Sequence, residues 1–199
     1  MPKILFKTHF TSKLQKGFTI LELLVSIAIV GILISVAAPK LSEFTVKLRV
    51  DNEVSELQRL VLSARNTAIN TGRYVTLCPL NGSVCGTNWA NELSVFANND
   101  STLANNQNYD SANEELIKVK GEVTTGDSLI FSDTIIRFAP TGRVLSGGNG
   151  RISYCPQGDL SFSRGLEISL SGRVYATSDL DDDGKDEYRN ASATEVSCS

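Results

Sequence analysis

The stretch Lys16-Gly17-Phe18-Thr19-Ile20-Leu21-Glu22 decides the fold, because it opens an apolar segment that ends near Ala38. Glu22 is the only charged residue in this segment, residues 18–38. A helix rises about 1.5 Å per residue, so a helix of this length crosses a hydrocarbon core about 30 Å thick. The segment therefore predicts a transmembrane helix that can also lie in a bundle of similar helices.

The residues before this segment form a basic leader. Residues 1–17 carry four lysines and no acidic residue. Positive charges beside a membrane segment favour the cytoplasmic side, so we expect a single-pass protein with a cytoplasmic leader and an exported C-terminal body. An ordinary signal peptide would instead be cut after the apolar stretch, following small residues. The run Val36-Ala37-Ala38 could serve as such a site, so this alternative stays open at this point.

Charge and histidine content exclude some classes of function. The chain has 19 basic and 22 acidic residues, and losing the leader removes four of the former and none of the latter. The acidic body that remains gives no general reason to bind phosphates, so we expect no nucleic-acid partner. The only histidine, His9, lies in the leader. Catalysis through a Ser/His, Cys/His or His–metal arrangement is therefore excluded for the exported form, and we expect no enzyme.

Four cysteines follow the apolar segment: Cys78, Cys85, Cys155 and Cys198. Exported thiols normally pair in an oxidising compartment, and four cysteines allow three connectivities. Sequence proximity favours Cys78 with Cys85 and Cys155 with Cys198, and the second pair would hold the C-terminus to the body. Four unpaired, buried cysteines are the alternative. A zinc site is not expected, because no Cys-x-x-Cys spacing occurs.

The helical pattern continues past the membrane segment. Apolar residues at three- and four-residue spacing predict that residues 39–71 form an amphipathic second half of the same helix. It should end near Asn70, because Thr71-Gly72 offers a glycine stop. Gly31 and Pro39 interrupt the pattern, so we expect a kink or local melting near residues 36–39. The apolar positions are Leu41, Phe44, Leu48, Val54, Leu57, Val61, Ala64 and Ala68.

The remainder, residues 72–199, has the composition of a β-rich head. Short apolar runs bounded by Gly, Pro, Asn or Asp predict strands, and the turn Ser171-Gly172 predicts a tight hairpin. An α+β fold follows, in which the amphipathic half-helix packs on an antiparallel sheet. Residues 97–113 are an Asn-rich surface insertion, and we expect Trp89 and Phe96 to pack in the core rather than bind a ligand. The predicted strands are 73–78, 92–96, 116–119, 128–131, 135–138, 151–155, 166–170 and 173–177.

The N-terminal run, Gly17 to Val25, resembles that of prepilin-like proteins. In the head, Phe138-Ala139-Pro140-Thr141-Gly142-Arg143 and residues 166–174 look like the two recurring motifs of the GspH/FimT family of type IV minor pilins and type II secretion pseudopilins. The resemblance implies a type IV pilin-like fold. From the residues themselves, Ala139-Pro140-Thr141-Gly142 is a turn sequence that shapes a corner of the sheet.

The same resemblance implies how the N-terminus is used. A prepilin peptidase would cut after Gly17 and methylate the new amino group of Phe18. Glu22 would then pair with the N-terminal amine of an adjacent subunit, since a carboxylate in a bilayer costs at least about 2.5 kcal/mol and an unpaired buried charge is disfavoured. The alternative is that Glu22 snorkels to the headgroups and pairs with nothing.

The resemblance implies three functions. The first is a minor pilin near the tip of a type IV pilus that primes assembly with other minor pilins and the major pilin, and the two cysteine pairs common in the FimU-like branch favour it. The second is a GspH-type pseudopilin of a type II secretion system. The third, a DNA-uptake receptor, is disfavoured, because Gly172-Arg173-Val174-Tyr175 lacks the second arginine of the family's DNA-binding tail and an acidic run follows it.

That acidic run, Asp179 to Glu187, is a candidate metal site. Carboxylates at the first, third, fifth and ninth places and glycine at the sixth match the front of a calcium loop, in which the seventh residue supplies only its carbonyl. The twelfth place is Asn190 rather than the Glu that completes an EF-hand. A solvated acidic loop is the alternative. The candidate calcium ligands are Asp179, Asp181, Asp183, Lys185 and Glu187.

Overall fold

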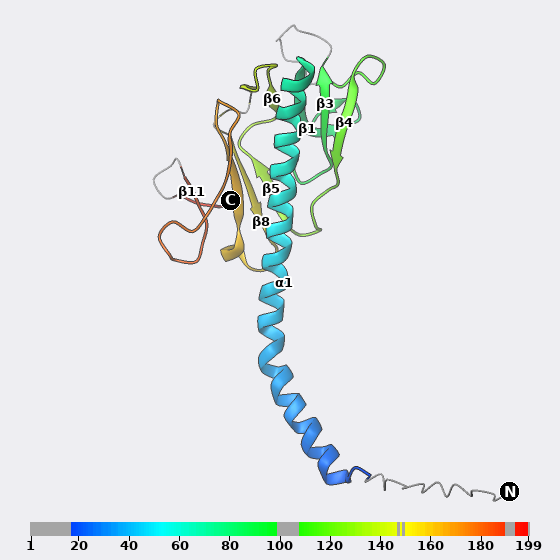
Figure 1. Cartoon of the computed structure of the whole chain (residues 1–199), viewed down its shortest axis with the longest axis vertical. Helices are drawn as coiled ribbons and strands as arrows, with labels where there is room; N and C mark the ends of the chain where they lie inside the picture. Colours follow the sequence, from blue (N-terminus) through cyan, green and yellow to red (C-terminus); the bar gives the residue numbers. More distant parts are fainter. Residues whose placement is uncertain (1–16, 99–107, 147, 149, 190–193, 199) are drawn as a thin grey trace, which may run out of the picture. The chain divides into compact units, whose positions relative to one another are not determined.

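The computed structural model describes residues 17–98, 108–146, 148, 150–189 and 194–198 (Figure 1). It forms two compact units, Met1–Glu43 and Phe44–Ser199. The leader before Gly17, with His9, and the central part of the insertion, residues 99–107, lie outside the described residues. The second unit groups the later part of the helix with the strands that follow it, so the unit boundary lies within the predicted amphipathic half.

Helix α1, Ile20–Thr71, passes through both units. In the first unit, residues 17–38 are all exposed. Residues 36–39 remain helical, so the expected local melting does not occur. A helix can keep its other hydrogen bonds where proline removes one donor.

In the second unit, α1 places one apolar stripe against the head. Leu41, Phe44 and Leu48 stay exposed, so the prediction that the amphipathic face starts there is wrong. The helix ends at Thr71, as the Thr71-Gly72 stop predicts. The buried stripe is Val50, Val54, Leu57, Leu60, Val61, Ala64 and Ala68.

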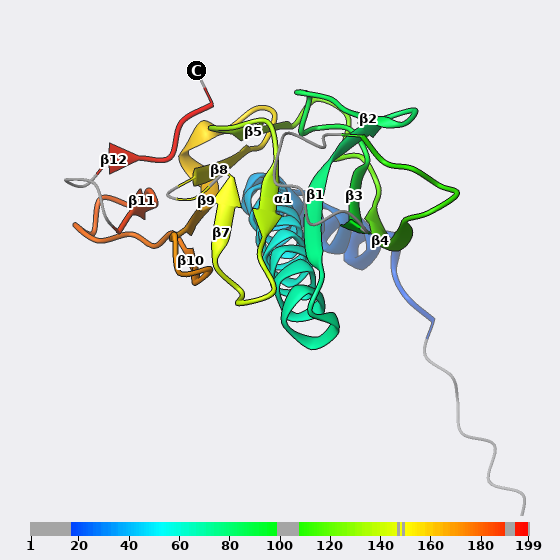
Figure 2. The ribbon, with the colours of Figure 1, turned by 90° about the horizontal axis from the view of Figure 1, so that it is seen from above.

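Two antiparallel sheets cover this stripe, and Figure 2 shows them on one side of α1. The larger has the order β4-β3-β1-β6-β7, with β2 paired to β1, and the smaller has the order β10-β9-β8-β5. The elements are β1 (Tyr74–Asn81), β2 (Val84–Cys85), β3 (Leu93–Asn98), β4 (Glu115–Lys120), β5 (Ser128–Phe131), β6 (Ile136–Phe138), β7 (Val144–Ser146), β8 (Gly150–Cys155), η1 (Leu160–Phe162), β9 (Arg164–Ile168), β10 (Val174–Ala176), β11 (Glu187–Tyr188) and β12 (Thr194–Glu195).

The head confirms all eight predicted strands and the β9–β10 hairpin, whereas β2, β7, β11 and β12 were not predicted. Trp89 is buried and its ring lies 4.5 Å from that of Phe131, and Phe96 is buried in a smaller cluster with Cys78 and Cys85. Both aromatic side chains therefore pack in the core as expected. Ala97 and Asn98 belong to β3 rather than to the surface insertion.

Two glycine turns join the sheets to the helix. Gly142, between β6 and β7, has φ 75°, and Gly172, between β9 and β10, has φ 78°. The Val144 N–H donates to the Leu170 carbonyl at 3.1 Å, which links the two turns. From α1, Arg65 Nε donates to the Gly142 carbonyl at 3.1 Å. A Cβ on Gly172 would lie 2.1 Å from that same carbonyl oxygen, so only glycine fits this approach.

Candidate assembly segment and acidic loop

The start of α1 is capped by Thr19. The Glu22 N–H donates to Thr19 Oγ1 at 3.2 Å, and the Leu23 N–H donates to the Thr19 carbonyl at 3.2 Å. Threonine is a good N-cap, and a carboxylate in the first turn is favoured by the helix dipole. Gly17, Phe18 and Glu22 are exposed in this segment. Sequence reasoning missed the cap, although Thr19-x-x-Glu22 is the pattern of a capping box.

The exposed apolar surface of α1 lies directly behind this cap. Residues 20–38 include many large apolar side chains, each more than half exposed, such as Leu21, Leu24 and Leu33. Within the described residues, this helix is the one candidate membrane span by length and composition. A surface that is apolar on all sides of a helix needs lipid or other helices around it.

Charged residues of α1 pair with the head where the buried stripe begins. Arg49 Nε lies 3.0 Å from Asp127 Oδ2, and Glu53 pairs with the buried Lys120 at 2.8 Å. Asp127 also accepts a hydrogen bond from the Tyr154 hydroxyl. Burial, followed by this contact with Asp127, raises the pKa of Tyr154. These contacts fix the helix on the sheets.

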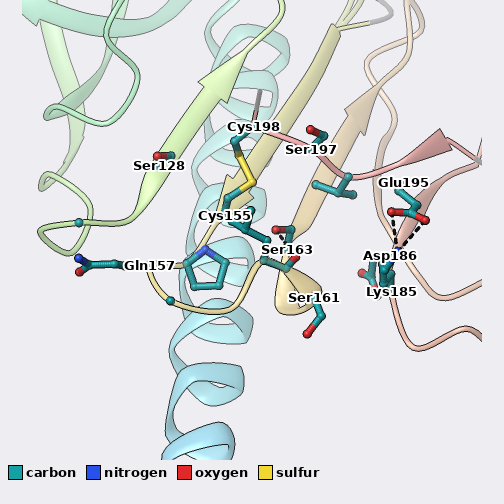
Figure 3. A pocket seen from close by; sticks show the side chains of 15 residues that line it. Ser128, Cys155, Gln157, Ser161, Ser163, Lys185, Asp186, Glu195, Ser197 and Cys198 are labelled. Atoms are coloured by element: carbon teal, nitrogen blue, oxygen red, sulfur yellow. Dashed lines mark hydrogen bonds and ion pairs between the residues drawn. A yellow bond between two sulfur atoms is a disulfide. The ribbon is translucent and has the colours of Figure 1, made fainter.

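The structure contains two disulfides, Cys78–Cys85 and Cys155–Cys198. This is the pairing that sequence proximity favours. The second disulfide joins the end of β8 to the C-terminal segment and borders a cleft that η1 and Lys185 also line (Figure 3). The other polar groups that line this cleft are mainly serines, and among the described lining residues none pairs a nucleophile with a base.

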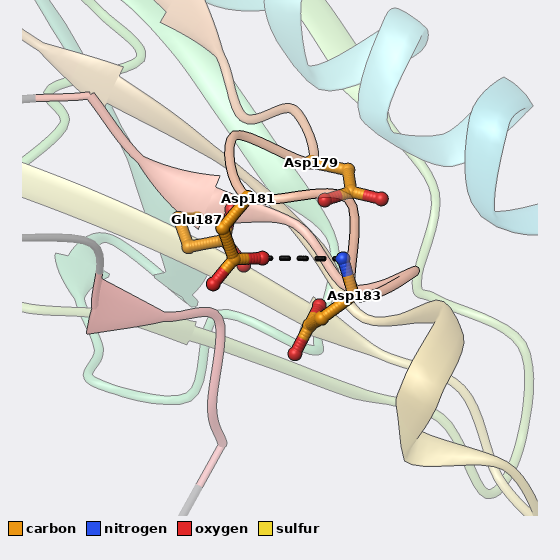
Figure 4. Close-up of side chains that lie close together, drawn as sticks. All are labelled: Asp179, Asp181, Asp183 and Glu187. Atoms are coloured by element: carbon orange, nitrogen blue, oxygen red, sulfur yellow. Dashed lines mark hydrogen bonds between the residues drawn. The ribbon is translucent and has the colours of Figure 1, made fainter.

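The acidic loop brings four predicted ligands together. Asp179, Asp181, Asp183 and Glu187 each offer an oxygen, and these oxygens lie within 4.8 Å of one another (Figure 4). The three aspartates are exposed and Glu187, the first residue of β11, is buried. The Lys185 side chain is not one of these possible ligands, and its Nζ lies 3.9 Å from Asp183 Oδ2.

Lys185 Nζ instead donates to both Glu195 oxygens at 2.9 Å, which raises the pKa of Lys185. Only the Lys185 carbonyl is therefore available as a ligand, as the predicted calcium loop requires. Asn190, in the twelfth place, lies outside the described residues.

Comparison with known proteins identifies the family. The profile of the family described as "Type II transport protein GspH" matches residues 53–172, well over half of the chain. The chain belongs to this family. A second profile, the prokaryotic N-terminal methylation motif, matches residues 12–38. The first match covers the packed part of α1 and both glycine turns, and the second covers Gly17, Phe18 and Glu22.

Individual curated relatives share a part of their sequence with this chain. A fimbrial protein of Pseudomonas aeruginosa is 40% identical over 63 residues, which are 32% of this chain and 40% of the relative. The major pilin PilE1 of Neisseria gonorrhoeae is 49% identical over 61 residues, or 31% and 37% of the two chains. This chain thus spans about two fifths of the length of these curated relatives.

A solved structure agrees in fold. The type IV minor pilin FimU of Pseudomonas aeruginosa superposes with a TM-score of 0.53 at 17% identity, over 66% of this chain and 90% of that chain. At this identity the likeness shows the fold alone. The expected fold, a long N-terminal helix packed on an antiparallel β-sheet head as in type IV pilins, is confirmed.

Proposed function

We propose that this GspH-family chain is a minor pilin, a structural subunit that enters a type IV pilus near its tip and primes assembly. The observation that carries the proposal is the exposed apolar helix of residues 20–38, which lies within the match to the methylation motif, residues 12–38. Before assembly this helix would sit in the inner membrane, with the head in the periplasm. In the filament, the corresponding helices of the major pilin and other minor pilins would replace the lipid.

Processing by a prepilin peptidase between Gly17 and Phe18 would create the charged amine that Glu22 needs. Glu22 is exposed, like the rest of residues 17–38. In an apolar bundle of helices an unpaired carboxylate is costly, and a neighbour's N-terminal amine would neutralise it. This pairing would set the axial register of the subunit.

The test replaces Glu22 by valine in the source bacterium. The Glu22→Val chain keeps its cap, because the Thr19 contact uses the backbone N–H of residue 22. We expect normal cleavage of the leader and about a tenfold loss of the subunit from sheared filaments. The neighbour's N-terminal amine would be left as an unpaired buried charge, at a cost of about 1.4 kcal/mol or more. Mass spectrometry of the N-terminus and immunoblots of filaments would measure the two steps.

Glu43→Val is the matched control. Glu43 lies on the same helix and pairs with the exposed Lys40 at 3.2 Å, an ion pair of small energy. We expect this variant to enter filaments normally. Normal incorporation of Glu22→Val, or equal loss of both variants, would contradict the register role of Glu22.

A pseudopilin of a type II secretion system is the second candidate, and the family match favours it. Deletion of the gene separates the two. Loss of surface pili with intact export of folded proteins supports the minor pilin, and the reverse result supports the pseudopilin.

A further inference from the structure

We propose that residues 179–187 form a calcium site in which Glu187 is the buried closing ligand. The site concerns the head alone and does not depend on which filament the chain enters. Three aspartates at alternate positions reach the ion from the exposed loop, and Glu187 reaches it from the first residue of β11 (Figure 4).

Glu187 itself points to a cation. Its side chain is 1% exposed, and its Oε2 accepts a hydrogen bond from the Leu180 N–H at 2.7 Å. Its Oε1 is buried and has no hydrogen-bond partner among the described residues. Buried carboxylate oxygens without a partner are costly and rare in folded proteins. A bound cation would satisfy this oxygen.

Three basic side chains near the loop are engaged by other groups. Lys185 binds Glu195, the Arg189 guanidinium lies over the Tyr175 ring at 5.6 Å, and the Arg151 guanidinium lies over the Tyr188 ring at 4.7 Å. A side-chain cation therefore does not neutralise Glu187 within the described part of the chain.

The kind of ligand suits calcium better than magnesium. Calcium holds oxygens at about 2.3–2.6 Å, so ligands on opposite sides of the ion lie about 4.6–5.2 Å apart. The four carboxylate oxygens lie within 4.8 Å of one another, which fits one such sphere. Magnesium needs a strict octahedron and usually keeps several waters, so a cluster of four protein carboxylates suits it less.

The aspartates are already held in place through one oxygen each. Asp179 accepts from the Gly184 N–H at 2.9 Å, Asp181 from the Asp183 N–H at 3.2 Å, and Asp183 from the Lys185 N–H at 2.8 Å. Among the described residues, the second oxygens of Asp179 and Asp181 accept no hydrogen bond, and Asp183 Oδ2 lies 3.9 Å from Lys185 Nζ, beyond hydrogen-bond distance. The loop therefore closes with the ninth residue, Glu187, in place of a twelfth-position glutamate.

Ion binding would also hold the end of the head. Asp186, beside Glu187, pairs with Arg164 at 3.2 Å, and its carbonyl accepts from the Val196 N–H at 2.9 Å. Arg164 in turn pairs with Asp51 on α1. An ion that fixes Glu187 would thus stabilise the contacts between the C-terminal segment, β9 and the helix.

The experiment titrates calcium into the full chain in detergent micelles after treatment with a chelator. Calorimetry should show one calcium per chain, with Kd of about 10⁻⁴–10⁻³ M as in extracellular modules. Calcium should raise the melting temperature, and magnesium at the same concentration should raise it less. No saturable binding at about 10 mM calcium, or two or more equal weak sites, would overturn the site.

Three variants separate specific ligation from general attraction to negative charge. Asp181→Asn and Glu187→Gln should each weaken calcium binding at least about tenfold, because each removes a charged ligand. Asp182→Asn is the matched control: it removes the same charge from the same loop, and asparagine tolerates the φ of 62° at this position. Equal weakening in Asp182→Asn and Asp181→Asn would show diffuse attraction and overturn the proposal.

Glu187→Gln also gives a second readout that a purely structural role would not produce. Without calcium this variant should melt at a higher temperature than the wild type, because it removes an unpaired buried carboxylate. With calcium the order should reverse. A variant that melts lower than the wild type in both conditions by the same amount would overturn the role of Glu187 as a ligand.

Discussion

The two halves of α1 carry similar apolar residues but bury them differently. Residues 20–38 are apolar on every side and wholly exposed, whereas residues 50–68 bury one stripe against the sheets and keep polar residues between its members. A stripe can be covered by sheets of the same chain, but an apolar surface all round a helix cannot be covered by one sheet. The spacing of apolar residues therefore decides whether a helix segment is stabilised by its own head or by lipid and neighbouring subunits.

The largest effect should come from equal truncations in the two halves. Leu60→Ala should lower the free energy of unfolding of the head by about 2–5 kcal/mol, because Leu60 is fully buried. Leu24→Ala, at a residue that is 54% exposed, should leave that free energy unchanged. Urea unfolding of the full chain in detergent, followed by Trp89 fluorescence, measures both. A similar loss from Leu24→Ala would show that the first half is coupled to head stability.

A smaller effect should come from the glycine turns where the second half meets the sheets. Gly172→Ala should destabilise by about 2–3 kcal/mol, since it adds a clash with the Gly142 carbonyl to the strain of a positive φ. Gly158→Ala, at φ 97° with open space around it, should show only the strain, about 1–2 kcal/mol. The same urea titration compares them, and equal losses would mean that the meeting of the two turns adds no stability.

Residue patterns predicted the parts of the fold that have local signals. The eight predicted strands were found because each lies in an apolar run between turn residues, and helix α1 was found by its length and spacing. The strands β2, β7, β11 and β12 have two or three residues each and lie in no longer apolar run, so no period shows. They form because they pair with another strand: β2 with β1, β7 with β6, and β11 with β12.

The candidate sites also divide into features with a local sequence signal and features that depend on tertiary packing. The acidic loop could be predicted because its ligands alternate within nine residues, but the burial of Glu187 could not. That burial depends on β11 pairing with β12 and on the bridge between Ser178 and Glu187. The contact between Gly142 and Gly172 was missed for the same reason, since it forms only when both turns pack on Arg65. The roles of Gly17, Phe18 and Glu22 stay predictions, because their partners are other molecules.

The smallest predicted effect on stability concerns Tyr154, which lies beside charged groups that the second half of α1 contacts. The pKa of Tyr154 is raised by burial and by Asp127, which Arg49 of α1 also contacts, so folding favours the neutral phenol. An unfolded tyrosine ionises near pH 10. The unfolded chain therefore loses this proton first, and the stabilisation is present below about pH 10 and is lost as the pH rises above it. Tyr154→Phe should destabilise by about 1.5 kcal/mol at pH 7, through loss of a hydrogen bond to a charged acceptor.

Above about pH 10 the difference between the two chains should shrink, because phenylalanine has no proton to lose. Tyr188→Phe is the informative comparison, since burial raises the pKa of Tyr188 but its hydroxyl contacts Ser153 rather than a carboxylate. It should show a weaker dependence on pH. Urea unfolding of the three chains between about pH 7 and pH 11 measures this. Parallel curves for Tyr154→Phe and the wild type would mean that the contact between helix, Asp127 and Tyr154 does not govern alkaline stability.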